Sequence, residues 1–95
     1  MTKTIILNFL KEHKDELEEK YGLLKIGLFG SYAKGTANEH SDIDLAIVTK
    51  KKDFFLREDL KDFLEKKFNL PVDIGYLDSF RGFYKSKIEK EIIYV

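Results

Sequence analysis

Apolar residues recur at helical spacing across residues 4–21, and Gly22 follows where a helix stop belongs. This period predicts one helix with a single face on the core. Two short apolar runs come next, over residues 24–29 and 42–48, and each predicts a strand because a buried strand is short and apolar. The segment between these strands is rich in small residues, and residues 32–36 are expected to form a short helix within it.

The second half of the chain continues the alternation of helices and strands. Asp53 is a suitable N-cap for a helix over residues 54–68, and Asn69-Leu70-Pro71 ends that helix. Residues 72–77 predict a third strand. Asp78 or Ser79 is expected to cap a last helix, whose apolar side comprises Phe80, Phe83, Tyr84, Ile88 and Ile92.

The predicted fold is α/β, with a small mixed sheet of about three strands flanked by helices. At 95 residues the chain is expected to be a single domain over residues 1–95, with a modest core and no room for a second lobe. Lys and Arg together number 17, as do Asp and Glu, so the formal net charge of zero argues against a dedicated nucleic-acid surface.

The chain contains no cysteine, which excludes disulfides and thiolate metal sites. Its apolar runs are too short to span a bilayer, and no signal peptide is recognisable. We therefore expect a cytoplasmic protein without membrane association.

The candidate chemistry lies between the first two predicted strands. Asp42 and Asp44 are two residues apart, so on a strand both carboxylates point to the same face. Such a pair repels itself unless a cation intervenes, and clustered oxygen ligands suit Mg²⁺. Gly30 allows a ligand to approach the backbone, and Ser31 stands where a strand turns into a short helix, which favours anions. A metal-bound polyphosphate fits this combination.

The motif Gly30-Ser31, ten residues, then Asp42-Ile43-Asp44 resembles the signature of the DNA polymerase β-type nucleotidyltransferase superfamily, and the brevity of the chain resembles its minimal branch. The likeness extends over nearly the whole chain, because Asp73 stands on the third predicted strand, where the family has its third carboxylate. The resemblance implies the polymerase β-type nucleotidyltransferase fold.

The resemblance also implies the roles of these acids. Asp42 and Asp44 would be ligands of two Mg²⁺ ions, and Asp73 would bind one of them and help to deprotonate the attacking hydroxyl. Two cations roughly 4 Å apart stabilise both the attacking and the leaving oxygens of an in-line displacement. The family therefore implies a metal-dependent nucleotidyl transfer with ATP as the favoured substrate.

The remaining site residues implied by the resemblance are on the turn. Gly30 and Ser31 would contact the nucleotide phosphates. Lys34 stands where many members of the family have Arg, so a contact with the triphosphate is implied, although Lys lacks the bidentate fork of Arg.

Minimal members of this branch resemble the antitoxins of HEPN/MNT toxin–antitoxin pairs, which transfer AMP to a tyrosine of the HEPN toxin. The resemblance therefore implies a toxin partner and an antitoxin role. Two alternatives remain open. The acceptor of the nucleotide could be a small molecule or an RNA end, or the chain could neutralise a toxin by binding alone.

Simpler interpretations exist for individual residues. Asp42 and Asp44 could be solvated acids at a strand start, Asp73 an exposed acid after Pro71, and Ser31 only a helix cap. Histidines in polar segments are usually solvated, so His13 and His40, like the lysine run at residues 50–52, are expected at the surface.

The chain is 14% aromatic, which is more than so small a core needs. Phe54, Phe55 and the terminal residues 92–95 are the candidates for a protein interface.

Overall fold

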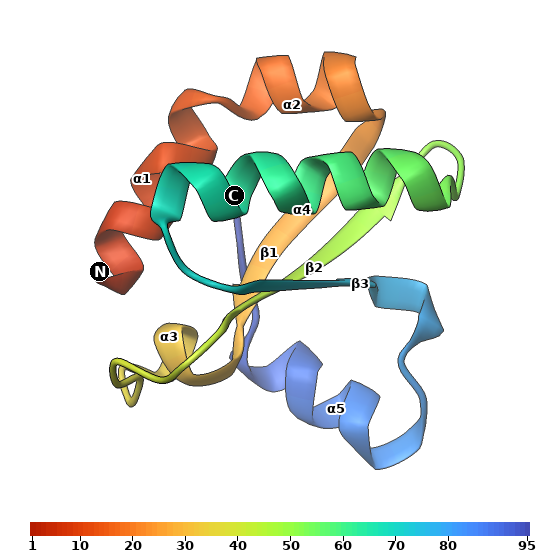
Figure 1. Ribbon diagram of the computed structural model, residues 1–95. Helices are drawn as coiled ribbons and strands as arrows, with labels where there is room; N and C mark the ends of the chain where they lie inside the picture. The colour runs from red at the N-terminus through yellow and green to blue at the C-terminus, as the bar shows by residue number, and fades with distance from the viewer.

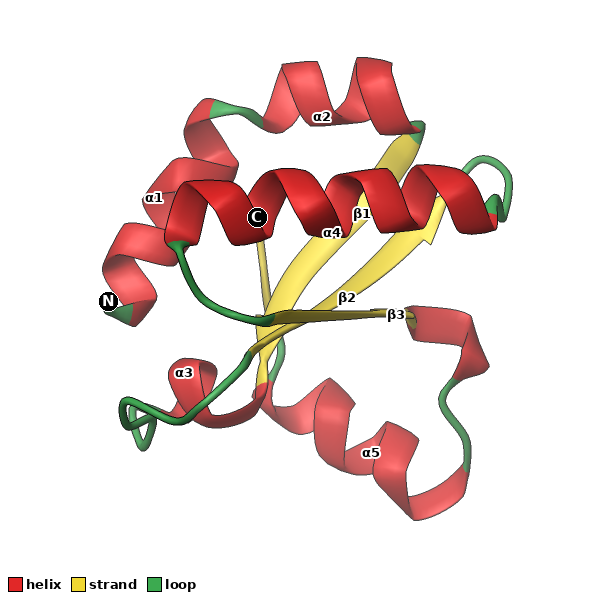
Figure 2. Ribbon diagram, in the orientation of Figure 1, coloured by secondary structure: helices red, strands yellow, loops and turns green.

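The computed structural model describes all residues, 1–95, as a sheet with helices on both faces (Figures 1 and 2). The elements in chain order are α1 (Lys3–Glu12), α2 (Lys14–Tyr21), β1 (Leu23–Phe29), α3 (Gly30–Lys34), β2 (Ile43–Thr49), α4 (Phe54–Phe68), β3 (Val72–Tyr76), the 3₁₀ turn η1 (Leu77–Ser79), α5 (Gly82–Glu91) and β4 (Ile93–Tyr94). The predicted α/β class is confirmed.

The sheet has the strand order β3-β2-β1-β4. β1 pairs antiparallel with both β2 and β4, whereas β2 and β3 pair in parallel, so the sheet is mixed as predicted. The fourth strand was not predicted, because β4 is only two residues long and directly follows α5. It pairs Ile93 with Leu28 and Tyr94 with Gly27 at the outer edge of β1.

The prediction of one helix over residues 4–21 is wrong in one respect, because the helix breaks at His13. The backbone of this residue leaves the helical region, with φ −103° and ψ 9°. His13 was expected at the surface and is half-buried. Its ring stacks on Phe9 with centroids 4.1 Å apart, and Nδ1 lies 2.9 Å from the Phe9 carbonyl oxygen. The chain changes direction at this break, so α1 and α2 run at an angle to each other (Figure 1).

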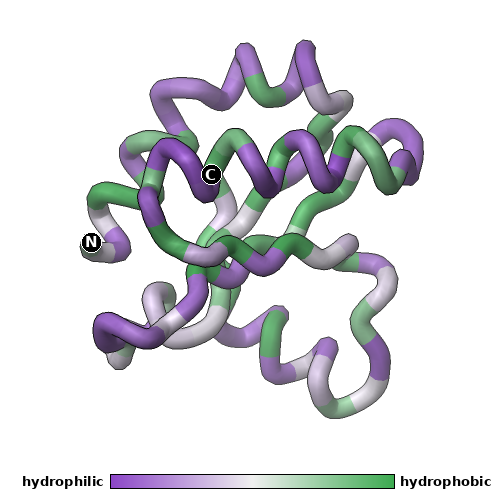
Figure 3. Tube along the Cα trace, viewed as in Figure 1, coloured by the Kyte–Doolittle hydropathy of each residue, from purple (hydrophilic) through white to green (hydrophobic).

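One face of the sheet carries the larger core. α1, α2 and α4 cover this face, and α5 lies on the other (Figure 1). The inward residues of β2 are Ile43, Leu45 and Ile47, all at most 1% exposed. In Figure 3 the apolar colour concentrates on the strands, while the outer turns of the helices are hydrophilic. This alternation is the expected consequence of burying strands between two helical layers.

Three small residues form a trough across the opposite face of the sheet. Gly27 of β1, Ala46 of β2 and Gly75 of β3 lie side by side in the strand register. A Cβ atom at Gly27 would lie 2.6 Å from Cγ1 of Ile92, and one at Gly75 would lie 2.7 Å from the Phe80 ring. Because these positions have little or no side chain, α5 and its flanking residues approach the sheet closely.

The start of the last helix differs from the prediction. Asp78 and Ser79 belong to η1, and α5 begins only at Gly82, with Arg81 as its N-cap. The carboxylate of Asp78 lies 3.0 Å from Lys52 Nζ, so it serves an ion pair instead of a helix cap. None of the helices has the length and apolar character of a membrane span.

Candidate active site

Three carboxylates meet at the end of the sheet where β2 and β3 begin. Asp44 and Asp73 are direct partners in the parallel register, and Asp42 lies two residues before Asp44, just ahead of β2. We call Asp42, Asp44 and Asp73 the acid row. Ile43 and Leu45 point to the larger core, so the alternation along β2 directs Asp44 to the face that carries α5. The structure thus brings together all three acids that the sequence singled out.

The environment of Asp44 disfavours its charged form. Burial raises the pKa of this carboxyl from 3.8 to about 6, and the negative charges of Asp73, Asp42 and Glu91 add to the shift. Desolvation and like charges both penalise an anion, so a cation placed among these groups would be bound favourably. Glu91, the last residue of α5, was not predicted to be near the site.

Asp73 is more exposed than Asp44, and its pKa is also raised. Desolvation is the largest cause, followed by the charge of Asp42 and a side-chain hydrogen bond with it, while Lys61 opposes the shift. A carboxyl whose pKa lies above its ordinary value is a better proton acceptor than an unperturbed one. This property suits a general base.

Gly30 and Asp44 are in direct contact. Gly30 has a φ of +77°, and a Cβ atom at this position would collide with the carboxylate of Asp44. Phe29, the preceding residue, pairs with Asp44 in the register of β1 and β2. The absence of a side chain at Gly30 therefore leaves room for the Asp44 carboxylate beside the turn, and joins the two halves of the sequence motif into one unit.

The turn after β1 is the short helix α3, which begins at Gly30, two residues before the predicted start at residue 32. Ser31 is half-exposed in its first turn, and its carbonyl oxygen accepts a 2.9 Å hydrogen bond from the Thr36 N–H. Ser31 is therefore held at the same end of the sheet as the acid row.

The polar loop before Asp42 is held by its own hydrogen bonds. Asn38 N–H donates to Ser41 Oγ at 2.9 Å, and His40 N–H donates to Asn38 Oδ1 at 2.8 Å. The loop thereby delivers Asp42 to the start of β2. His40 has an 87% exposed side chain and contacts only the neighbouring Glu39, as expected for a solvated histidine.

Lys34 lies on α3 and reaches toward the last turn of α5. Its Nζ is 3.6 Å from Oε2 of Glu91. The Lys34 side chain is 45% exposed and the Glu91 side chain only 13%. Lys34 is thus paired with Glu91, whose charge acts on Asp44, and this ion-pair partner comes from the far end of the sequence.

The donor set fits magnesium only together with a substrate. No group of three or more His, Cys, Asp or Glu side chains is close enough together to hold a metal ion with protein ligands alone. Mg²⁺ usually binds one or two carboxylates and takes its remaining ligands from water and substrate phosphates. The acid row supplies oxygen ligands of this kind next to Gly30, whose lack of a side chain makes room for the Asp44 carboxylate, so these residues fit a magnesium–nucleotide complex.

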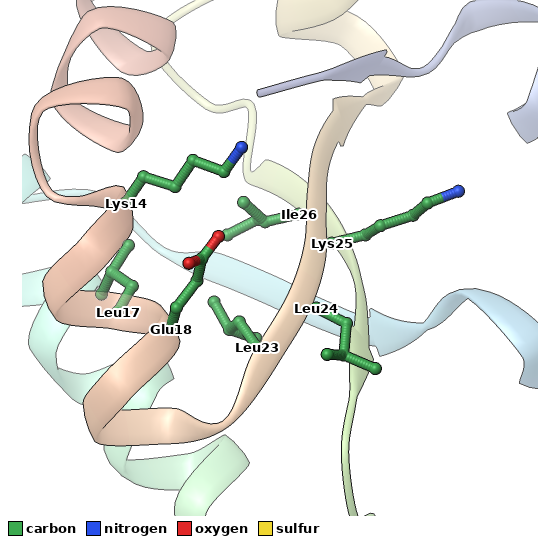
Figure 4. A pocket seen from close by; sticks show the side chains of 7 residues that line it. All are labelled: Lys14, Leu17, Glu18, Leu23, Leu24, Lys25 and Ile26. Atoms are coloured by element: carbon green, nitrogen blue, oxygen red, sulfur yellow. The ribbon is translucent and has the colours of Figure 1, made fainter.

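The surface hollows lie elsewhere. One is a crevice between α2 and β1, where Leu17, Leu23 and Ile26 lie together with Lys14 and Glu18 beside them, whereas the Lys25 side chain points away across β1 (Figure 4). It contains one carboxylate and no residue of the acid row. The acid row lies outside the surface hollows, with Asp42 and Asp73 exposed and Asp44 half-buried.

The predicted interface residues divide into two groups. Phe54 and Phe55 are 58% and 77% exposed at the start of α4, as the interface hypothesis requires. Ile92, Ile93 and Val95 instead pack against the two clusters of the core, and of the terminal segment only Tyr94, 45% exposed, stays available for an interface. The lysine run is at the surface as predicted, with Lys52 paired to Asp78.

Comparison with known proteins gives a consistent result. Residues 10–95 match the family described as the nucleotidyltransferase domain. The protein adenylyltransferase MntA of Thermococcus cleftensis is 33% identical over 96 residues, covering 100% of this chain and 97% of the relative.

Solved structures agree with the sequence comparison. A structure assigned as a minimal nucleotidyltransferase superposes with a TM-score of 0.79 at 26% identity, covering 98% of this chain and 95% of the other. A toxin–antitoxin crystal structure with AMP-PNP superposes with a TM-score of 0.71 at 25% identity, covering 99% of this chain and 72% of the other.

Proposed function

Because this chain belongs to the nucleotidyltransferase domain family, we propose that it is a protein adenylyltransferase that moves AMP from ATP to a hydroxyl of a partner HEPN toxin and thereby acts as an antitoxin. The observation that carries the proposal is the acid row beside Gly30. Asp44 and Asp73 are register partners, and Gly30 leaves room for the Asp44 carboxylate directly beside the turn that begins α3.

The chemistry follows from the placement of the side chains. The acceptor oxygen attacks the α-phosphorus of ATP, the bond to the β-phosphate oxygen breaks, and pyrophosphate leaves. Asp73 takes the proton of the attacking hydroxyl, a role that its raised pKa supports. Gly30, Ser31 and Lys34 bind and orient the triphosphate, which supplies much of the rate by positioning.

Asp42 and Asp44 would hold Mg²⁺, with Asp73 as a further ligand. When bound, Mg²⁺ neutralises charge on the triphosphate and makes the acceptor hydroxyl easier to deprotonate. The raised pKa of Asp44 supports this assignment, because a site that penalises its own negative charge gains from a cation.

The partner is proposed from three observations. The adenylyltransferase relative matches this chain along nearly its whole length, and the structure with AMP-PNP is that of a toxin–antitoxin pair. Asp42 and Asp73 of the acid row are exposed at the end of the sheet, so a protein side chain, for which we propose tyrosine, can approach it. The cytoplasm, where ATP and Mg²⁺ are abundant, is the proposed location.

The test is the intact mass of the protein encoded by the neighbouring gene after incubation with this chain, ATP and Mg²⁺. The control is the Asp42→Ala/Asp44→Ala variant. We expect a mass gain of one or more AMP units with the unaltered chain and none with the control. A stable complex without a mass gain would favour neutralisation by binding alone. Neither a gain nor a complex would favour a small-molecule or RNA acceptor.

A further inference from the structure

Glu91 is a carboxylate that the proposed reaction does not yet use. It ends α5, its side chain is 13% exposed, and Oε2 lies 3.6 Å from Lys34 Nζ. Its charge also contributes to the raised pKa of Asp44, which places it beside the acid row. A fourth acid at this edge needs a physical reason, because it adds to the repulsion among the other three.

Two features make Glu91 unfavourable for the stability of the fold. It lies at the C-terminal end of a helix, where the helix dipole disfavours a negative charge. It also repels Asp44. The ion pair with Lys34 offsets little of this cost, because the lysine is 45% exposed and solvent screens such pairs. The position of Glu91 therefore has little value for folding.

The backbone nevertheless holds Glu91 firmly in place. Ile92 N–H donates a 2.9 Å hydrogen bond to the Ile88 carbonyl oxygen, and the next residue, Ile93, pairs with Leu28 in β4. Gly27 in the trough leaves room for Ile92 against β1. Glu91 is thus fixed between the end of a helix and the start of a strand, and its carboxylate has a defined position relative to α3.

We infer that Glu91 is a positioning residue for nucleotide binding, which holds the Lys34 ammonium at the acid row so that Lys34 contacts the triphosphate. The inference rests on the proposed function and adds to it a residue outside the Gly-Ser and aspartate motif. A lysine has a flexible stem, and fixing its end with an acceptor lowers the conformational entropy lost when the phosphate binds. Glu91 stabilises the position of the cation, and the cation binds the ligand.

Removing the charge of Glu91 tests the inference, because the direction of the change in ATP affinity distinguishes two explanations. If Glu91 were only a nearby anion, Glu91→Gln would strengthen the binding of the anionic triphosphate by removing repulsion. If Glu91 positions Lys34, the same substitution weakens binding, with an expected effect of about fivefold, the size appropriate to a partly exposed ion pair. The two explanations thus predict opposite changes.

The experiment measures the Kd of ATP with Mg²⁺ by calorimetry in the unaltered chain, Glu91→Gln, Lys34→Met and the double variant. Glu89→Gln is the matched control, because Glu89 lies on the same helix and only makes an exposed 4.0 Å pair with Lys85. We expect weaker binding in Glu91→Gln, unchanged binding in Glu89→Gln, and no further loss when Glu91→Gln is added to Lys34→Met. In transfer assays Glu91→Gln should raise KM for ATP with little change in kcat.

Unchanged or tighter ATP binding in Glu91→Gln would overturn the inference, as would losses that add in the double variant, because Glu91 would then act independently of Lys34. These measurements need no acceptor, so they stand even if the partner is misidentified. An unaltered chain that binds no nucleotide would overturn the proposed function and this inference together.

Discussion

Because Gly30 is in contact with the Asp44 carboxylate, adding a single methyl group at Gly30 tests the geometry of the site. Gly30→Ala adds a methyl group that collides with this carboxylate and also strains a backbone with φ of +77°. We expect AMP transfer to fall by at least a hundredfold because a 1 Å misplacement at a reacting centre has that effect. The measurement is the initial rate of transfer.

Gly35→Ala is the matched control for Gly30→Ala. Gly35 has the same φ of +77°, but no atom lies within 4 Å of an added Cβ. It should lose about 1 kcal/mol of stability from backbone strain and keep most of its activity. Equal loss of activity in both variants would assign the effect to strain in the turn and would contradict the role of the Asp44 contact.

Asp44 links the site to the pH dependence of folding. Its pKa is about 6 in the folded chain and 3.8 as the ordinary value, so between these values the folded state holds more protons than the unfolded state. The contribution of Asp44 to stability is therefore fully present below pH 3.8 and is lost as the pH rises through 6. In the metal-free chain, Asp44→Asn should be more stable at pH 7 by about 1 kcal/mol, after allowance for solvent screening.

Denaturant unfolding at pH 4 and pH 7 measures this effect. The gain of Asp44→Asn over the unaltered chain should be smaller at pH 4, and transfer activity should be nearly absent in the variant. Asp59→Asn, on the exposed face of α4, is the control and should change neither quantity. An Asp44→Asn variant that is less stable than the unaltered chain at pH 7 would show that burial and the neighbouring acids do not penalise the charged Asp44 carboxylate.

Local chemistry could be predicted from the sequence at this scale, but long-range pairs could not. The sequence predicted that Gly30, Asp42 and Asp44 combine in one site for a metal-bound polyphosphate, because strand alternation and a turn are local properties. Glu91 gave no such signal. Its role depends on how α5 packs over the trough, and a single acid near the end of a charged helix resembles any solvated residue.

At the scale of elements, the trough determines how closely α5 approaches the site. Gly27→Ala places a methyl group 2.6 Å from Cγ1 of Ile92, so Ile92 and the adjacent Glu91 must shift. We expect a loss of about 1 to 3 kcal/mol of stability from overpacking. We also expect severalfold weaker ATP binding, measured by calorimetry.

Asp53→Ala is the control for Gly27→Ala, because it should lower the stability of the fold without weakening ATP binding. Asp53 caps α4 through hydrogen bonds from Phe55 N–H and Leu56 N–H, at the end of β2 away from the acid row. Loss of this cap should cost about 1 kcal/mol. The ATP affinity of Asp53→Ala should match that of the unaltered chain. If Asp53→Ala weakened ATP binding as much as Gly27→Ala does, general stability and not the placement of α5 would control the site.

Element types were easier to predict than element ends. The bounds of α4 match the prediction because a cap and a proline mark them. The break at His13 was missed because the apolar period continues across it, and the ring of His13 stacks on Phe9 within that period. The start of α5 was misplaced because Asp78, a good cap by composition, instead pairs with Lys52.

At the scale of the whole molecule, ligand binding should report on the acid row through global stability. ATP alone adds negative charge to an edge that already repels itself, so it should bind well only with Mg²⁺. At ATP concentrations about tenfold above Kd, stabilisation is about 1.4 kcal/mol, or roughly 6 to 11 °C in Tm. A thermal scan with ATP and Mg²⁺ measures the shift.

Addition of a chelator should abolish most of this shift, and Asp44→Asn should show little of it under any condition. A full shift from ATP in the presence of the chelator would contradict the assignment of the acid row to a metal-bound nucleotide.

Whole-molecule features such as the strand order β3-β2-β1-β4 could not be predicted from the sequence, because pairing between distant strands depends on packing.

The trough also constrains how the sequence can change. Gly27 and Gly75 face residues on opposite sides of α5 in the sequence, so the tolerance of each position to substitution depends on its own partner. Enlarging Gly27 becomes acceptable only if Ile92 becomes smaller, and enlarging Gly75 only if Phe80 does. Such pairs would be recognised as epistasis in a library of double variants, where substitutions that are harmful singly restore each other.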